Sequence, residues 1–128
     1  MIRYLTAKEI LVLHALIVER TNGSHGVRDP KLLESIAHRP QARFGGKDVH
    51  NDLFAKAAAL GEALVNYYVF VDGNKRTAFI AMTQFLFLNG FTIRAAQEEV
   101  ERTMILVAKK EMGVEDLRDW IGKFVQEN

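Results

Sequence analysis

Residues 74–90 read NKRTAFIAMTQFLFLNG, and this stretch decides the fold. Its apolar side chains cover most of the circumference of a helix, and a helix that is apolar almost all round is normally buried among other elements. Asn89 and Gly90 form a typical stop signal at its carboxyl end. The stretch therefore predicts a buried central helix that begins near Asn74, ends at Asn89-Gly90 and forms the axis of the fold.

Five further helices are predicted around this axis from apolar periodicity and end signals. Thr6 and Glu9 form a capping box for the first helix, which ends at 21–24. Asp29 and Pro30 start a short second helix that stops near residue 40. Small residues dominate the third, so that a neighbouring helix can approach it closely. The third, fifth and sixth helices cover 52–67, 97–112 and 114–126, with a glycine-containing loop at 44–47 and a briefly extended segment at 91–93.

The bulk composition fits one soluble domain. The 128 residues are 48% hydrophobic and 26% charged, the mixture of an ordinary globular protein. A net charge of +1 gives no reason to expect broad nucleic-acid binding, and the lack of cysteine excludes disulfides and thiolate sites. We find no signal peptide and no apolar stretch of membrane-spanning length. We expect a single all-α domain over 1–128, located in the cytoplasm, with no direct nucleic-acid or membrane contact.

The turn before the central helix, residues 72–77 (DGNKRT), concentrates charge between two aliphatic helices. Lys75 and Arg76 lie in the first helical turn, where the helix dipole disfavours cations unless an anion is bound. Unpaired main-chain N–H groups at such an end bind phosphate, and Gly73 allows the main chain to turn amides inward. The pattern favours a phosphate site over the simpler alternative, an ordinary helix cap followed by two surface cations.

Two further side chains of the turn fit the same interpretation. Asp72 cannot bind an anion itself, but its carboxylate is well placed if a divalent cation bridges it to phosphates. Asn74 is expected to cap the helix and to offer its amide to a phosphate oxygen. The turn therefore predicts a site for phosphate and a divalent cation together.

Residues 68–78 read YVFVDGNKRTA and resemble the motif of the Fic/Doc superfamily, H-x-F-x-(D/E)-G-N-(G/K)-R. The Doc branch of that family has the form H-x-F-x-(D/N)-x-N-K-R-T-A, and this chain matches every fixed position except the first. The similarity continues at 23–29, 39–41 and 44–46 in the same order, and it extends to length and helical plan. It covers essentially the whole chain.

The resemblance implies a compact Fic/Doc-like bundle and a specific activity. Doc-type members are toxins of toxin–antitoxin pairs and transfer the γ-phosphate of ATP to a threonine of translation elongation factor Tu, which blocks translation. By resemblance, Asp72 would hold Mg²⁺ on the ATP phosphates, and Gly73, Asn74, Lys75 and Arg76 would bind the nucleotide. A cognate antitoxin would fold its C-terminal segment onto a groove. Lys75 stands where AMP-transferring members have glycine, which points to phosphoryl transfer.

The departure at Tyr68 concerns the catalytic base. The family's histidine accepts the proton of the target hydroxyl, and imidazole titrates near neutrality. A phenol has a pKa near ~10 and stays protonated at neutral pH. We therefore expect this chain to be inactive or nearly so. The tyrosine is either native to a degenerate member or an inactivating substitution of a natural histidine. The intact remainder of the motif favours the second explanation.

Two other functions remain open from the sequence. The chain would be a non-catalytic, antitoxin-binding co-regulator if Tyr68 is native, or an AMP transferase to protein hydroxyls if the Fic-type reaction applies. His14 is expected to be a packed, hydrogen-bonded core residue. His25, His38 and His50 lack the spacing of metal ligands and are expected to be structural or exposed.

Overall fold

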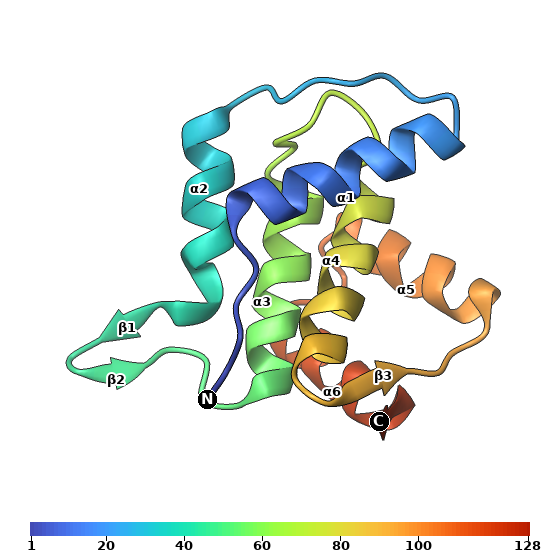
Figure 1. Ribbon diagram of the computed structural model, residues 1–128. Coiled ribbons are helices and arrows are strands. Elements are labelled where there is room, and N and C mark those ends of the chain that lie inside the picture. Colours follow the sequence, from blue (N-terminus) through green and yellow to red (C-terminus); the bar gives the residue numbers. More distant parts are fainter.

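The computed structural model describes residues 1–128 and consists of six α-helices with a few short strands (Figure 1). This arrangement confirms the all-α bundle that the sequence predicts. None of these helices combines the length and the apolar character that a membrane-spanning segment requires. The helices are α1 (Ala7–Arg20), α2 (Pro30–His38), α3 (Leu53–Asn66), α4 (Asn74–Leu88), α5 (Gln97–Ala108) and α6 (Val114–Phe124), with a 3-10 turn η1 (Arg39–Gln41) after α2.

The helix starts follow from capping chemistry. The Thr6 hydroxyl accepts from the Glu9 amide while the Glu9 carboxylate accepts from the Thr6 amide, so the predicted capping box is present. Asp29 and Asp52 each accept a hydrogen bond from the main-chain N–H three residues further on. These side chains satisfy amides that a helix leaves unpaired, which is why the first three helices begin where the sequence indicates.

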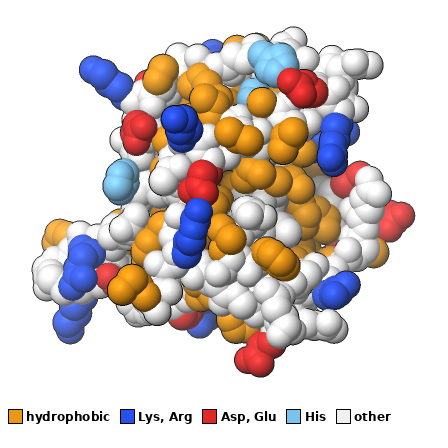
Figure 2. Space-filling model, viewed as in Figure 1, with side chains coloured by type: hydrophobic (Ala, Val, Ile, Leu, Met, Phe, Trp, Pro, Cys, Tyr) orange, Lys and Arg blue, Asp and Glu red, His pale blue; other side chains and the backbone are white.

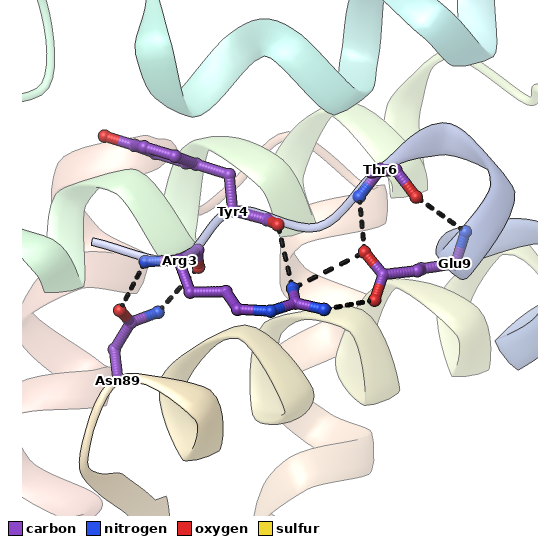
Figure 3. A network of polar contacts seen from close by, with 5 residues as sticks. All are labelled: Arg3, Tyr4, Thr6, Glu9 and Asn89. Atoms are coloured by element: carbon purple, nitrogen blue, oxygen red, sulfur yellow. Dashed lines mark hydrogen bonds and ion pairs between the residues drawn. The ribbon is translucent and has the colours of Figure 1, made fainter. Parts of the chain in front are cut away.

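The amino-terminal segment is held against the carboxyl end of α4 (Figure 3). The Asn89 side chain accepts from the Arg3 amide at 2.8 Å and donates to the Arg3 carbonyl at 2.9 Å. The Arg3 guanidinium pairs with Glu9 at 2.6 Å, which connects the amino-terminal segment to the first turn of α1. The network therefore links the start of α1 to the end of α4, and the two helices are also in direct contact.

The most buried helix is α3, which corrects the prediction that α4 forms the axis. Ten of the fourteen residues of α3 are buried, against six of the fifteen in α4. Antiparallel neighbours in Figure 1, α3 and α4 share the most extensive helix contact, and α3 also packs on α6, α5, η1 and α2. The face of α4 with Phe79, Ile80 and Phe87 remains partly or largely exposed. Apolar periodicity alone cannot distinguish a face buried by its own fold from one left open at the surface.

Lys56 of α3 is buried, which no pattern in the sequence predicts. Its ammonium donates to the Pro40 carbonyl at 2.9 Å and lies 3.4 Å from an Asp48 carboxylate oxygen, which holds η1 and the following hairpin on α3. A buried lysine needs such partners, because an unpaired buried charge is costly. The ammonium also lies 5.7 Å from the centre of the Tyr4 ring.

The strands revise several predicted boundaries. The loop expected at 44–47 is a hairpin of β1 (Arg43–Phe44) and β2 (Lys47–Asp48), because Gly45 and Gly46 adopt the positive φ values of a tight two-residue turn. The segment expected to be extended is β3 (Phe91–Ile93), and it pairs antiparallel with β4 (Val125–Glu127). The sixth helix therefore ends at Phe124 instead of Gln126.

The fifth helix is also shorter than predicted. It ends at Ala108, not Met112, because Lys110 takes a left-handed conformation with φ of 63°. The amides of Glu111 and Met112 then turn back onto the Leu106 carbonyl. No glycine or proline marks this stop in the sequence, so the apolar periodicity extends past it.

Candidate active site

The loop between α3 and α4 is folded tightly by its own side chains. Phe70 is completely buried. Asn74 accepts from the Phe70 amide at 3.1 Å and donates to the Phe70 carbonyl at 2.9 Å. Its amide group therefore locks the loop instead of capping α4, which corrects the predicted cap. One N–H of its amide nitrogen stays outside these two bonds.

The amino end of α4 is open to an anion. The residue before the helix is Gly73, with φ of 76°, and no side chain caps this end. The amides of the first turn lack intrahelical partners there, and the helix dipole adds positive potential. Lys75 and Arg76 are both exposed beside them. The structure thus places two cations and a free helix terminus around the same loop.

Asp72 is oriented by main-chain donors on both carboxylate oxygens. One oxygen accepts from the Gly73 amide at 2.8 Å and the other from the Ser24 amide at 3.1 Å. Ser24 comes so close because residue 23 is glycine, where an added Cβ would lie 2.9 Å from Asp72 Oδ2. Each oxygen keeps lone pairs that face solvent, so the carboxylate can still coordinate a cation.

These hydrogen bonds make a pH dependence testable. The Ser24 amide, followed by the Gly73 amide, lowers the pKa of Asp72 because both donate to the charged form. A lowered folded-state pKa stabilises the fold above the unfolded pKa of about 3.9, and this contribution is lost as the pH falls through the folded value. Carbon-13 NMR titration is expected to place the Asp72 midpoint below about 3.9, and Asp72→Asn must remove that signal. A midpoint at or above the unfolded value would contradict the geometry.

Residues 23–28 lie alongside the loop before α4 and form one wall of the candidate site. The sequence alone does not predict that this segment lies next to the loop. Val27 and Phe70 form an antiparallel β-bridge. The Arg28 amide donates to the Val69 carbonyl at 2.8 Å, and the Val71 amide donates to the Gly26 carbonyl at 3.1 Å. The resemblance at 23–29 marks the segment, but only the three-dimensional arrangement shows that it braces the loop before α4.

Tyr68 begins this loop in a strained conformation. Its φ is +50°, a left-handed value that is unusual for a residue with a bulky side chain, and the residue is 60% exposed. Its neighbour Tyr67 is half-exposed and lies under the Arg39 guanidinium, 5.1 Å from the ring centre. Such backbone strain recurs at functional sites, where the surrounding structure enforces it.

The histidines His25, His38 and His50 all lie outside the loop that carries the motif at 68–78. His25 faces Glu19 on α1 at 4.0 Å, and His38 is exposed at the end of α2. His50 is half-buried before α3, and burial together with the charges of Lys56 and Arg39 lowers its pKa. No cluster of three metal-binding side chains occurs in the chain. Any cation at Asp72 would therefore need its remaining ligands from water or from a bound molecule.

An apolar groove extends from the two cations of the loop. It has a volume of about 620 Å³ and is lined by α1, α4, α5 and the segment around β3. Figure 2 shows hydrophobic side chains gathered on this hollowed face of the molecule. Lys75 and Arg76 border it, while Phe79, Ile80 and Ile105 supply apolar surface. The groove accounts for the incomplete burial of Phe79 and Ile80 on α4.

Comparisons with known proteins agree with the motif. The model of the Fic/DOC family matches residues 4–86. The protein named Toxin Doc from Mycolicibacterium smegmatis is 39% identical over 102 residues, covering 80% of this chain and 75% of that protein. The protein named Protein kinase doc from Escherichia phage P1 is 32% identical over 117 residues, covering 91% of each chain.

Proposed function

This chain belongs to the Fic/DOC family, in the branch of the Doc toxins, and we propose that it is the toxin of a toxin–antitoxin pair. We propose further that its site is built to transfer the γ-phosphate of ATP to a threonine of translation elongation factor Tu. The reaction would take place in the cytoplasm and would block translation. Its ligands would be ATP and Mg²⁺.

The observation that carries this proposal is the uncapped amino end of α4 beside two exposed cations. Free amides, Lys75 and Arg76 together suit a polyphosphate, and the Arg76 guanidinium suits paired phosphate oxygens. Phosphoryl transfer depends mainly on positioning and on charge stabilisation of this kind. An ordinary helix cap would not place two cations at the positive end of a helix.

The donor set at Asp72 fits magnesium on a nucleotide. Mg²⁺ is usually held by one or two carboxylates together with phosphates and water, not by an all-protein cage. Asp72 offers one carboxylate, held in place by two amides, and no further acidic ligand is clustered with it. Mg²⁺ bound there would neutralise phosphate charge during transfer.

Transfer by this chain itself is expected to be very slow, because Tyr68 provides no base at neutral pH. The remaining parts of the site do not depend on residue 68. Asp72 keeps its two amide donors, and the amino end of α4 stays open. We therefore expect ATP to bind with Mg²⁺ even though the transfer step is impaired.

Labelled ATP tests the proposed reaction. Purified elongation factor Tu is incubated with the chain or its Tyr68→His variant, and with ATP labelled at either the α- or the γ-phosphate. Transfer of the γ-label by the variant supports the proposal, whereas transfer of the α-label would identify an AMP transferase. If neither label is transferred while an antitoxin still binds, the chain is a non-catalytic co-regulator instead.

We assign the groove between α1, α4 and α5 to the antitoxin. Its volume and apolar lining suit one face of an amphipathic helix, a common way for proteins to recognise a folding segment. The neighbouring cations favour acidic residues at one end of that segment. The partly exposed Phe79 and Ile80 of α4 support this assignment, because they line the groove and offer apolar surface to a partner helix.

A paired substitution tests the groove. Ile80→Glu is expected to weaken binding of the protein encoded beside this chain's gene by at least about tenfold, because it buries a carboxylate in an apolar contact. Val12→Glu makes the same chemical change on an exposed position of α1 outside the groove and should leave the affinity unchanged. Titration calorimetry measures both. Equal effects of the two substitutions would contradict the groove assignment.

A further inference from the structure

His14 of α1 is buried directly beneath the motif loop. Only 1% of the residue is exposed. Its ring stacks on the Phe70 ring, with 3.8 Å between ring centres and 7° between planes. Its Nε2 lies 2.8 Å from the Asp72 carbonyl oxygen. A carbonyl oxygen can only accept, so Nε2 must carry the hydrogen of this bond.

This bond completes the support of Asp72 from three directions. His14 holds its carbonyl from within the core, while the Ser24 and Gly73 amides hold its carboxylate at the surface. Next to it, Gly73 lies against α1, where an added Cβ would be 3.4 Å from Val18. The main chain at 72–73 is thereby fixed between α1 and the wall at 23–28, at the point where α4 begins.

A core-packing role alone does not account for this geometry. Stacking on Phe70 needs an aromatic ring, which phenylalanine would provide. The hydrogen bond to Asp72 needs a donor at one ring position. His14 cannot serve as the catalytic base that Tyr68 fails to provide, because the His14 ring is buried and its Nε2 already donates to the main chain.

We propose that His14 is a positioning residue, which fixes the main chain of Asp72 so that its carboxylate points at the cation of a bound nucleotide. The role toward the nucleotide rests on the proposed function, whereas the ordering of the loop does not. Residues that orient a metal ligand typically alter metal affinity 10–100-fold when they are replaced. His14 would orient Asp72 through its main-chain carbonyl, so we expect an effect at the lower end of that range.

The test separates the hydrogen bond from the packing. His14→Phe keeps the stacked ring and removes the donor, and His14→Gln keeps an N–H donor without the ring. Ile10→Val is the matched control, since it trims a fully buried side chain on α1 that has no bond to the loop. Nitrogen-15 relaxation gives backbone order parameters for residues 71–74, and calorimetry gives ATP affinity with and without Mg²⁺.

In the parent chain, order parameters near ~0.85 are expected at 71–74, and His14→Phe should lower them below about 0.6. It should also reduce the gain in ATP affinity on adding Mg²⁺ by about tenfold or more. His14→Gln should restore part of the order. Ile10→Val should lower the melting temperature and change neither quantity.

Two results would overturn the proposal. One is a loop that stays as ordered in His14→Phe as in Ile10→Val, with the same Mg²⁺ gain. The other needs no variant: a neutral ring protonated at Nδ1 in the parent chain, as seen by nitrogen-15 NMR. If the parent chain does not bind ATP with Mg²⁺, the proposed function fails, and the order parameters alone decide whether His14 positions the loop.

Discussion

Replacing Tyr68 by histidine is expected to raise the rate of γ-phosphate transfer by roughly 10²–10⁴-fold, the usual contribution of a general base. The phenol of tyrosine is protonated at neutral pH, whereas a histidine with a pKa near ~6.5 is largely able to accept a proton. Asp72 already has its two amide donors, and the amino end of α4 has no side-chain cap. A single side chain should therefore decide activity.

The backbone at this position favours the same substitution. Tyr68 has φ of +50°, and histidine is among the residues that adopt left-handed values more readily than bulky ones. The side chain is largely exposed, so no core packing is lost. Tyr68→His should leave the melting temperature unchanged or slightly higher, while the rate rises as the pH passes through about 6.5.

Two controls define the effect. Tyr68→Phe removes the phenol and adds no base, so its rate should equal that of the parent chain. Tyr67→His places an imidazole on the neighbouring half-exposed position and should not restore transfer. Initial rates of γ-label transfer to elongation factor Tu measure all four proteins. A rate for Tyr68→His no higher than that of Tyr68→Phe would show that the missing base is not what limits this chain.

The second large effect is expected at Gly61, in the middle of α3. An alanine Cβ there would lie 2.3 Å from Met82 Sδ and 2.6 Å from Met82 Cγ on α4. Both residues are buried at the contact of the two helices. Gly61→Ala is therefore expected to lower the free energy of unfolding by about 1–3 kcal/mol through overpacking. The melting temperature should fall by about 4 °C per kcal/mol.

Whether Gly61→Ala lowers or raises the free energy of unfolding distinguishes an effect of packing from an effect of helix propensity. Alanine is normally about 1 kcal/mol better than glycine within a helix. Gly122 of α6 has no atom near the position of an added Cβ, so Gly122→Ala should stabilise the protein. Met82→Ala should reduce the penalty of Gly61→Ala in the double variant, because it removes the atoms that clash. Thermal unfolding of the four variants tests this, and a stabilising Gly61→Ala would show that the Met82 side chain can move aside without loss of packing.

The sequence predicts the helices well where side chains act locally. The side chains of Thr6, Asp29 and Asp52 cap helices by accepting from the main-chain N–H three residues further on, so those helix starts can be read directly from the sequence. The predicted ends at Met112 and Gln126 are wrong: α5 ends at Ala108 before the left-handed Lys110, and α6 ends at Phe124 because residues 125–127 pair with β3. Neither the left-handed lysine nor the strand pairing has a recognisable pattern in the local sequence.

The candidate site shows the same division. The motif at 68–78 identifies the family and predicts the anion-binding turn and the missing base without any structure, because these inferences depend on residue types at adjacent positions. It assigned Asn74 to capping, whereas the side chain locks the Phe70 main chain. The Phe70 amide and carbonyl compete with the helix amides for the Asn74 side chain. They come within hydrogen-bonding distance only when the loop is folded.

What the sequence by itself determined is the chemical make-up of the loop: its charges, its glycine and the tyrosine at the first position of the motif. What only the tertiary structure decided is how that loop is held. His14 and Ser24 hydrogen-bond to Asp72 from 58 and 48 residues away in the sequence. Apolar residues of α4 line an open groove instead of being covered by another helix. Contacts at such separations depend on how the helices pack, which no local pattern of residues specifies.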